Sequence, residues 1–101
     1  MNISGIGLLE EFWNRHRDSE RPLRQWIETV GQAQWETYPD CRGTFGAADQ
    51  VKLKGGVVTI FNIKGNRYRL VTAIVYRRGL VIVRRIMTHE EYSRERWKEI
   101  L

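Results

Sequence analysis

The apolar residues in the first third of the chain recur at the spacing of amphipathic helices. They form two stripes, made of Leu8, Leu9, Phe12 and Trp13 and of Leu23, Trp26, Ile27 and Val30. This pattern predicts one helix over residues 7–17 and a second helix that begins after Ser19. Ser19 can cap the second helix, and Pro22 is compatible with its first turn. Both stripes are expected to lie in the core.

The second half of the chain changes to the pattern of strands. After a turn at Lys54-Gly55-Gly56 come three runs rich in β-branched and aromatic residues, at Val57–Lys64, Arg67–Tyr76 and Leu80–Met87. Residues 37–50 are expected to form a loop, because Tyr38 precedes a proline and such a position disfavours helix. Met1–Ser4 is compatible with a short strand.

Gly65-Asn66 predicts a two-residue hairpin turn that fixes the register of the first two runs. The expected pairs are Lys64 with Arg67, Asn62 with Arg69, Ile60 with Val71, and Val58 with Ala73. Side chains alternate across a sheet. The face expected to pack on the helices holds Thr59, Phe61, Ile63, Tyr68, Leu70, Thr72, Ile74 and Tyr76. Near the turn, the other face is polar and cationic, with Asn62, Lys64, Arg67 and Arg69.

The third run adds one more arginine to that cationic face. A two-residue turn at Arg78-Gly79 would place Arg84 opposite Ala73, and a three-residue turn would place Arg85 there. The sequence leaves both registers open.

The last segment carries a helix start signal. Thr88 and Glu91 have the spacing of a capping box, which predicts a helix from His89 to about Ile100. His89 and Tyr92 lie three residues apart and therefore on one side of its first turn.

Together these elements predict an α+β fold. Two N-terminal helices would pack on a small, mostly antiparallel sheet, and a C-terminal helix would follow. The length of 101 residues predicts a single domain, residues 1–101. A hydrophobic content of 42% and four tryptophans are typical of a folded chain.

Charge is distributed very unevenly along the chain. Residues 1–50 hold five basic and eight acidic side chains, whereas residues 51–101 hold twelve basic and four acidic ones. Between Gln50 and His89 there is no carboxylate at all, although this stretch contains Lys52, Lys54, Lys64, Arg67, Arg69, Arg77, Arg78, Arg84 and Arg85. A strand-rich segment with so many uncompensated cations favours a polyanionic partner, and nucleic acid is the usual one. Cationic protection of a solvated sheet edge is the plainer alternative.

Several classes of protein are disfavoured by the composition. Cys41 is the single cysteine, and His16 and His89 lack metal-ligand spacing, so we expect no disulfide, metal or other cofactor. No apolar run approaches the roughly 20 residues of a membrane span. The N-terminus shows no signal-peptide pattern, so a cytoplasmic location is expected.

The predicted register brings together residues suited to RNA cleavage. Asn62 and Arg69 share a row, and His89 and Tyr92 follow the end of the third strand nearby. Attack by a 2′-hydroxyl on its own phosphodiester needs a base, an acid and cations for the growing negative charge, and it needs no metal. Taken singly, His89 is more typical of a surface histidine and Tyr92 of a core edge.

Two other functions are compatible with the same cationic face. A non-cleaving module that binds RNA or DNA would need the cations without the proton-transfer groups. Alternatively, the face would serve mainly to receive an acidic segment of a protein inhibitor.

Two segments of the sequence resemble a known family. Residues 61–71 (FNIKGNRYRLV) and 84–92 (RRIMTHEEY) are similar to those of the HigB-type toxins of bacterial toxin–antitoxin pairs, and residues 9–13 and 22–26 are also similar. These toxins belong to the RelE-like mRNA interferases. The resemblance implies helices on a small sheet, cleavage of mRNA on the translating ribosome, inhibition of translation, and silencing by a helix-turn-helix antitoxin of the HigA type.

The resemblance also suggests site residues. The positions that match the family motif are Asn62, Lys64, Arg69, Arg84, His89 and Tyr92. We assign catalysis to His89, Tyr92, Arg69 and Arg84, and RNA binding to Asn62, Lys64, Arg67 and Arg85. Which residue is the acid and which the base stays open. Family members commonly have aspartate after the motif tyrosine, where this chain has Ser93, so activity would be weakened if that carboxylate orients a catalytic group.

Overall fold

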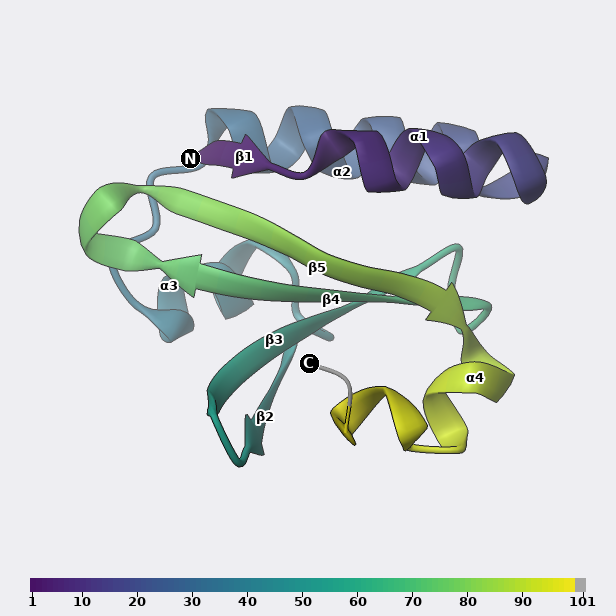
Figure 1. Ribbon diagram of the computed structural model, residues 1–101. Helices are drawn as coiled ribbons and strands as arrows, with labels where there is room; N and C mark the ends of the chain where they lie inside the picture. The colour runs from purple at the N-terminus through teal and green to yellow at the C-terminus, as the bar shows by residue number, and fades with distance from the viewer. Residues whose placement is uncertain (100–101) are drawn as a thin grey trace.

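The computed structural model describes residues 1–99 (Figure 1). Five strands form one sheet in the order β1-β5-β4-β3-β2, with bounds β1 Asn2–Ser4, β2 Asp49–Leu53, β3 Gly56–Ile63, β4 Tyr68–Val75 and β5 Leu80–Thr88. The α-helices are α1 Ile6–Arg15, α2 Glu20–Gln32, α3 Tyr38–Thr44 and α4 His89–Ser93. Three 3₁₀ turns complete the order, η1 Arg17–Ser19, η2 Tyr76–Arg78 and η3 Arg96–Glu99. The predicted α+β class is confirmed.

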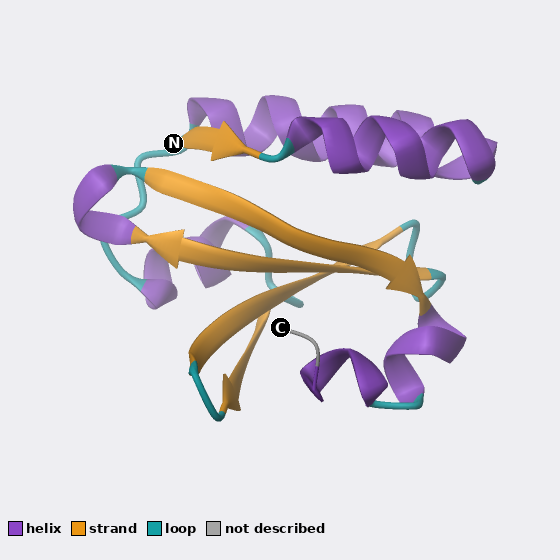
Figure 2. Ribbon diagram, viewed as in Figure 1, coloured by secondary structure: helices purple, strands orange, loops and turns teal. Residues whose placement is uncertain are grey.

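Two layers of helical structure enclose the sheet. Helices α1 and α2 run side by side over one face, and α4 lies on the other (Figure 2). The two predicted apolar stripes supply all the buried residues of α1 and α2, which are Leu9, Phe12, Trp13, Leu23, Trp26 and Val30. Leu8, which was predicted to lie in the core, is exposed. Helix α1 ends at Arg15 rather than Arg17, and the His16 ring then stacks on Phe12 with ring centroids 4.3 Å apart.

The predicted register of the β3–β4 hairpin is confirmed at its central pairs. Asn62 lies opposite Arg69, and Ile60 lies opposite Val71. Pairing extends only from Ile63–Tyr68 to Thr59–Thr72, so Val58 and Ala73 lie beyond its end. The face predicted to meet the helices does so through Phe61, Ile63, Tyr68, Leu70, Ile74 and Tyr76.

The position of the arginines on β5 differs from both predicted registers. Arg85 lies opposite Val71, and Ile82 rather than an arginine lies opposite Ala73. The register shifts between these pairs, which leaves Arg84 as the extra residue of a β-bulge. Counting from the turn alone could not reveal this extra residue.

The prediction of a loop over residues 37–50 was wrong. Helix α3 occupies part of it, because Pro39 stands in the first turn, where a missing N–H costs nothing. The Asp40 carboxylate accepts hydrogen bonds from the backbone N–H groups of Glu36 and Thr37 at 2.9 and 3.2 Å, which stabilises the helix start. Strand β2 then begins at Asp49 and pairs antiparallel with β3.

The capping box at Thr88 and Glu91 is confirmed, but the helix it starts is shorter than predicted. Helix α4 ends at Ser93, Glu95 adopts a left-handed conformation (φ 61°), and the predicted end at Ile100 lies outside the described residues. The break allows the Trp97 indole N–H to donate to the Tyr92 carbonyl at 3.0 Å. Trp97 is buried in a second core made of Val58, Ile60, Val71, Met87 and Trp97.

Within residues 1–99, none of the helices has the length and apolar character needed to cross a membrane.

Candidate functional site

A hollow of about 430 Å³ opens on the sheet face opposite α1 and α2. We call it the Arg69 hollow, and its lining residues are Arg42, Gly46, Ala47, Ala48, Asp49, Ile60, Asn62, Arg69 and Tyr92. They come from α3, its connection to β2, the start of β2, the two hairpin strands and α4. Three residues predicted from the sequence, Asn62, Arg69 and Tyr92, therefore share one hollow.

Arg69 is the buried cation of this hollow, with a relative exposure of only 8%. Its guanidinium donates to the Tyr68 carbonyl at 3.1 Å and to the Asn66 side-chain oxygen. Among residues 1–99, no carboxylate lies within salt-bridge distance of Arg69. Burying a charge without a counterion is costly, so this guanidinium is well placed to bind an incoming anion.

Tyr92 lies beside Arg69 at the edge of the same hollow. The Arg69 guanidinium carbon is 5.6 Å from the centre of the Tyr92 ring, and the ring stacks on Trp97 at 5.2 Å between centroids. Partial burial raises the pKa of the Tyr92 hydroxyl, and the negative charge of Asp49 raises it further, although Lys98 and Arg69 oppose this. Tyr92 therefore keeps its proton at neutral pH and can act as a proton donor.

His89 is exposed and does not line the Arg69 hollow. It is the first residue of α4, and its backbone N–H donates to the Arg67 carbonyl at 2.9 Å. Ser93 lies one turn later, with its hydroxyl oxygen 3.3 Å from His89 Nδ1. The same hydroxyl donates to the His89 carbonyl at 2.9 Å. Ser93, the residue at which the sequence departs from the expected motif, thus contacts His89.

The placement of Arg67 and Lys64 on the cationic face was wrong. Arg67 turns toward the helix side, where its Nε lies 3.4 Å from an Asp18 carboxylate oxygen. The Tyr68 hydroxyl donates to Asp18 at 2.5 Å, and this hydrogen bond is the main reason that the pKa of Asp18 is lowered. Lys64 has a positive φ of 53° and lines a neighbouring hollow beside α2, which shares Asn62 with the Arg69 hollow. Asp18, from the acidic N-terminal half, therefore holds Arg67 away from the predicted cationic face.

Arg84 and Arg85 also lie outside the Arg69 hollow. Both line a groove between α1 and β5, whose other members include Phe12, Arg15 and the carboxylates Glu11 and Glu91. The extra residue at the bulge and the position of β5 near the sheet edge account for this. Arg84 also lines a small hollow beside the β2–β3 turn, together with Leu53 and Val58. The cations predicted to share one face therefore lie in several separate places.

Two charged residues of the Arg69 hollow, Arg42 and Asp49, were not predicted as site residues from the sequence. Both fall in the segment predicted to be a loop, so no face could be assigned to them. If a strand had been predicted to begin at Asp49, this residue would have been placed on the face of the Arg69 hollow, because Asp49 pairs with Ile60 and shares its face. Among residues 1–99, no three His, Cys, Asp or Glu side chains lie together as a metal site would require.

Comparison with known families identifies the chain. A family model described as the HigB toxin, the RelE-like toxic component of a toxin–antitoxin system, matches residues 19–95. The matched range contains every residue that lines the Arg69 hollow. No curated protein matches the chain. A toxin of this kind implies an antitoxin as its partner. The chain therefore belongs to the HigB family of RelE-like toxins, the toxic components of toxin–antitoxin systems.

Proposed function

We propose that this toxin is a metal-independent endoribonuclease that cleaves mRNA on the translating ribosome, in the cytoplasm, and so inhibits translation. The observation that supports this most is the Arg69 hollow. There a buried guanidinium, without a carboxylate partner among residues 1–99, lies beside the Tyr92 hydroxyl, whose pKa is raised, and the Asn62 amide. RelE-like toxins generally act as mRNA interferases, which favours the same chemistry.

The reaction we propose is attack by a ribose 2′-hydroxyl on the adjacent phosphorus. A base removes the 2′ proton, the 2′ oxygen bonds to phosphorus, and the bond from phosphorus to the 5′ oxygen breaks. Tyr92 gives its proton to the departing 5′ oxygen, which leaves a 2′,3′-cyclic phosphate and a 5′-hydroxyl. Arg69 and Arg42 would stabilise the charge on the phosphate, and Asn62 would hold one of its oxygens.

Two residues are candidates for the base. Asp49 lines the Arg69 hollow, and among the described residues it is the only lining residue with a carboxylate. His89, the base or acid predicted from the sequence, lies outside the hollow and would reach a substrate at its rim. Asp49→Asn and His89→Gln separate the two, because the variant that lacks the base loses the acidic limb of the pH–rate profile.

The other predicted residues would act at a distance from the reacting phosphate. Arg84 and Arg85 on β5, with Lys64 and Arg67 at the β3–β4 turn, lie where they could bind the RNA backbone or the ribosome. Arg84 was assigned to catalysis from the sequence, and its place outside the hollow favours a binding role.

Cleavage of a defined message on purified ribosomes tests the proposal. The chain should produce fragments with cyclic-phosphate and 5′-hydroxyl ends, which are the products of a reaction that uses no metal-bound water. Arg69→Ala should abolish them, whereas Arg21→Ala, an exposed arginine of α2, should not. Tight, salt-sensitive binding with intact RNA would instead support the non-cleaving module and contradict the proposal.

We also propose that the antitoxin is of the helix-turn-helix HigA type. An inhibitor of this toxin would work by covering cations that the RNA needs, so a single surface could serve both partners. Growth on induction with and without the adjacent antitoxin-like reading frame tests this. Rescue of growth together with co-purification supports the pairing, and continued arrest contradicts it.

A further inference from the structure

A second hollow, of about 460 Å³, adjoins the Arg69 hollow on the side of α2. We call it the Trp26 hollow, and its lining includes Gln25, Trp26, Thr29, Phe45, Asn62 and Lys64. Asn62 lies near the end of β3, between the two hollows, and lines both of them. A chain that reaches the Arg69 hollow can therefore continue past Asn62 into the Trp26 hollow.

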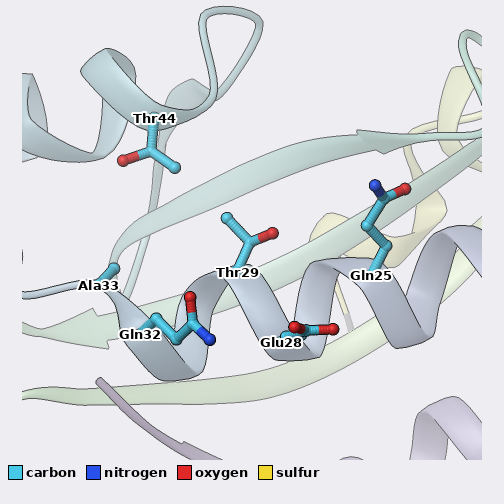
Figure 3. A pocket seen from close by; sticks show the side chains of 6 residues that line it. All are labelled: Gln25, Glu28, Thr29, Gln32, Ala33 and Thr44. Carbon is cyan, nitrogen blue, oxygen red and sulfur yellow. The ribbon is translucent and has the colours of Figure 1, made fainter.

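The path continues along α2 beyond the Trp26 hollow. A third hollow, of about 310 Å³, shares Gln25, Thr29 and Thr44 with it. Figure 3 shows Gln25 and Thr29 projecting from α2 toward the side where Thr44 of α3 lies. The third hollow also contains Glu28, whose negative charge disfavours a second phosphate there. The space next to Asn62 is thus suited to one nucleotide rather than to a longer stretch.

Trp26 lies at the base of the Trp26 hollow and carries a buried hydrogen-bond donor without a partner among the described residues. Its side chain is only 2% exposed, and its indole N–H has no acceptor among the described residues. By contrast, the indole of Trp35 donates to the Thr44 hydroxyl and that of Trp97 to the Tyr92 carbonyl, both at 3.0 Å. A buried N–H without a partner is costly and is uncommon in native proteins. The indole nitrogen exposes almost no surface to solvent, so Trp26 serves as a buried reporter beside the hollow rather than as a donor that a ligand reaches directly.

Lys64 supplies the single positive charge at the rim of the Trp26 hollow. Its neighbour Arg67 is paired with Asp18, but Lys64 forms no ion pair with the described residues. Lys64 also has a positive φ of 53°, which is uncommon for a residue with a Cβ. Gly65 follows it with a φ of 62°, so the conformation belongs to the tight β3–β4 turn, and this turn holds the Lys64 side chain beside the Trp26 hollow.

We propose that the Trp26 hollow binds the nucleotide next to the scissile phosphate and selects its base. The inference depends on the proposed function, because the Arg69 hollow supplies the position of that phosphate. The base would lie against the half-buried Phe45, over the buried ring of Trp26, its polar edge would meet Gln25 and Thr29, and Lys64 would bind its phosphate. Unstacked bases of single-stranded RNA are read in this way, by aromatic contact and by hydrogen bonds to their edges.

Nuclear magnetic resonance of the tryptophan indole N–H groups tests the proposal on the full chain. The probes are four 2′-O-methyl trinucleotides, one for each base, which cannot be cleaved. At least one should shift the Trp26 indole resonance, whereas that of Trp13 on α1 should stay unchanged. Gln25→Ala should weaken this binding by about 3-fold to 10-fold, as loss of one hydrogen bond implies. Gln34→Ala, an exposed glutamine that lines none of these hollows, should leave it unchanged.

The outcomes separate this inference from the proposed function. A Trp26 resonance that stays in place with all four probes overturns the subsite. If the Trp97 resonance then moves and the message is still cleaved, the proposed function stands without it. Movement of Trp26 in a chain that never cuts RNA would support the subsite and contradict the nuclease. A Gln25→Ala variant that loses the antitoxin but binds the probes normally would assign this surface to the antitoxin instead.

Discussion

At the scale of single residues, the Arg69 guanidinium explains most of the proposed chemistry. The sequence placed Arg69 in one row with Asn62, and the structure agrees. Its burial and its lack of a carboxylate partner could not be predicted, since both depend on Asn66 and on how Tyr92 packs. A guanidinium held in this way presents fixed donors to a phosphate, whereas a lysine presents a mobile point charge.

We therefore expect Arg69→Lys to lower the cleavage rate by about 10²-fold to 10³-fold, the usual cost of losing a preorganised donor to the transition state. The positive charge is kept, so the change isolates the loss of geometry. Single-turnover cleavage on ribosomes measures the effect, with Arg21→Lys as the matched control. A rate within twofold of the unchanged chain would show that charge alone suffices there.

Ser93 allows a test of His89. Its hydroxyl lies 3.3 Å from His89 Nδ1, so Ser93→Asp would bring a carboxylate to the same nitrogen. If His89 takes part in proton transfer, this change should raise the cleavage rate by about 2-fold to 10-fold, the worth of one improved hydrogen bond. Ser93→Ala is the control for loss of the hydroxyl. Equal cleavage rates in the unchanged chain, Ser93→Asp and Ser93→Ala would show that His89 takes no part in proton transfer.

At the scale of elements, alternation and turn chemistry were sufficient for the β3–β4 hairpin and insufficient elsewhere. In both strands of the hairpin the residues of the helix-facing side are mostly apolar, so the register followed from the alternation of residues and from the turn. Strand β2 was missed because it lies at the sheet edge and is short and half-exposed, so its apolar pattern is weak. Helix α3 could not be predicted from the local pattern, because a proline usually marks the end of a helix, whereas Pro39 stands in the first turn of this one.

The contact between η1 and β4 should make stability depend on pH. The Tyr68 hydroxyl and Arg67 lower the pKa of Asp18 below its ordinary value of 3.8. A depressed pKa in the folded state adds stability above the unfolded pKa, and this stability is lost as the pH falls through the folded pKa. Asp18→Asn should therefore lower the melting temperature at pH 7, and the difference should disappear as the pH falls below 3.8.

Melting curves between pH 2 and pH 7 measure this effect, and Tyr68→Phe serves as the companion variant because it removes the same hydrogen bond from the other side. A difference between Asp18→Asn and the unchanged chain that stays constant over the whole range would contradict the assignment.

At the scale of the whole molecule, the sequence revealed that the second half is basic but not where its cations would lie. Asp18 draws Arg67 to the helix side, and a β-bulge displaces Arg84. Both depend on contacts between distant segments, which a local pattern does not contain. Arg69 alone among the predicted cations lines the hollow next to Tyr92, where the proposed reaction takes place.

The arginines of β5 should then affect binding rather than chemistry. Replacing Arg84 and Arg85 together by alanine should weaken binding to single-stranded RNA. The slope of the logarithm of the binding constant against the logarithm of the salt concentration should become shallower by about 0.7 for each lost phosphate contact. The cleavage rate at saturation should stay the same. Alanine at both Arg77 and Arg78, two exposed arginines of η2, is the matched control. A lower saturated rate in the first variant would instead return Arg84 to the catalytic group.

The most direct measurement replaces the leaving oxygen of the RNA. A message whose scissile 5′ oxygen is sulfur needs no proton donor, because a thiolate departs unprotonated. We expect Tyr92→Phe to slow cleavage of ordinary RNA by about 10²-fold to 10⁴-fold and to cleave the sulfur-substituted RNA at the rate of the unchanged chain. Arg69→Ala should stay slow on both. A Tyr92→Phe variant equally slow on the two substrates would contradict the assignment of Tyr92 as the acid beside the buried arginine.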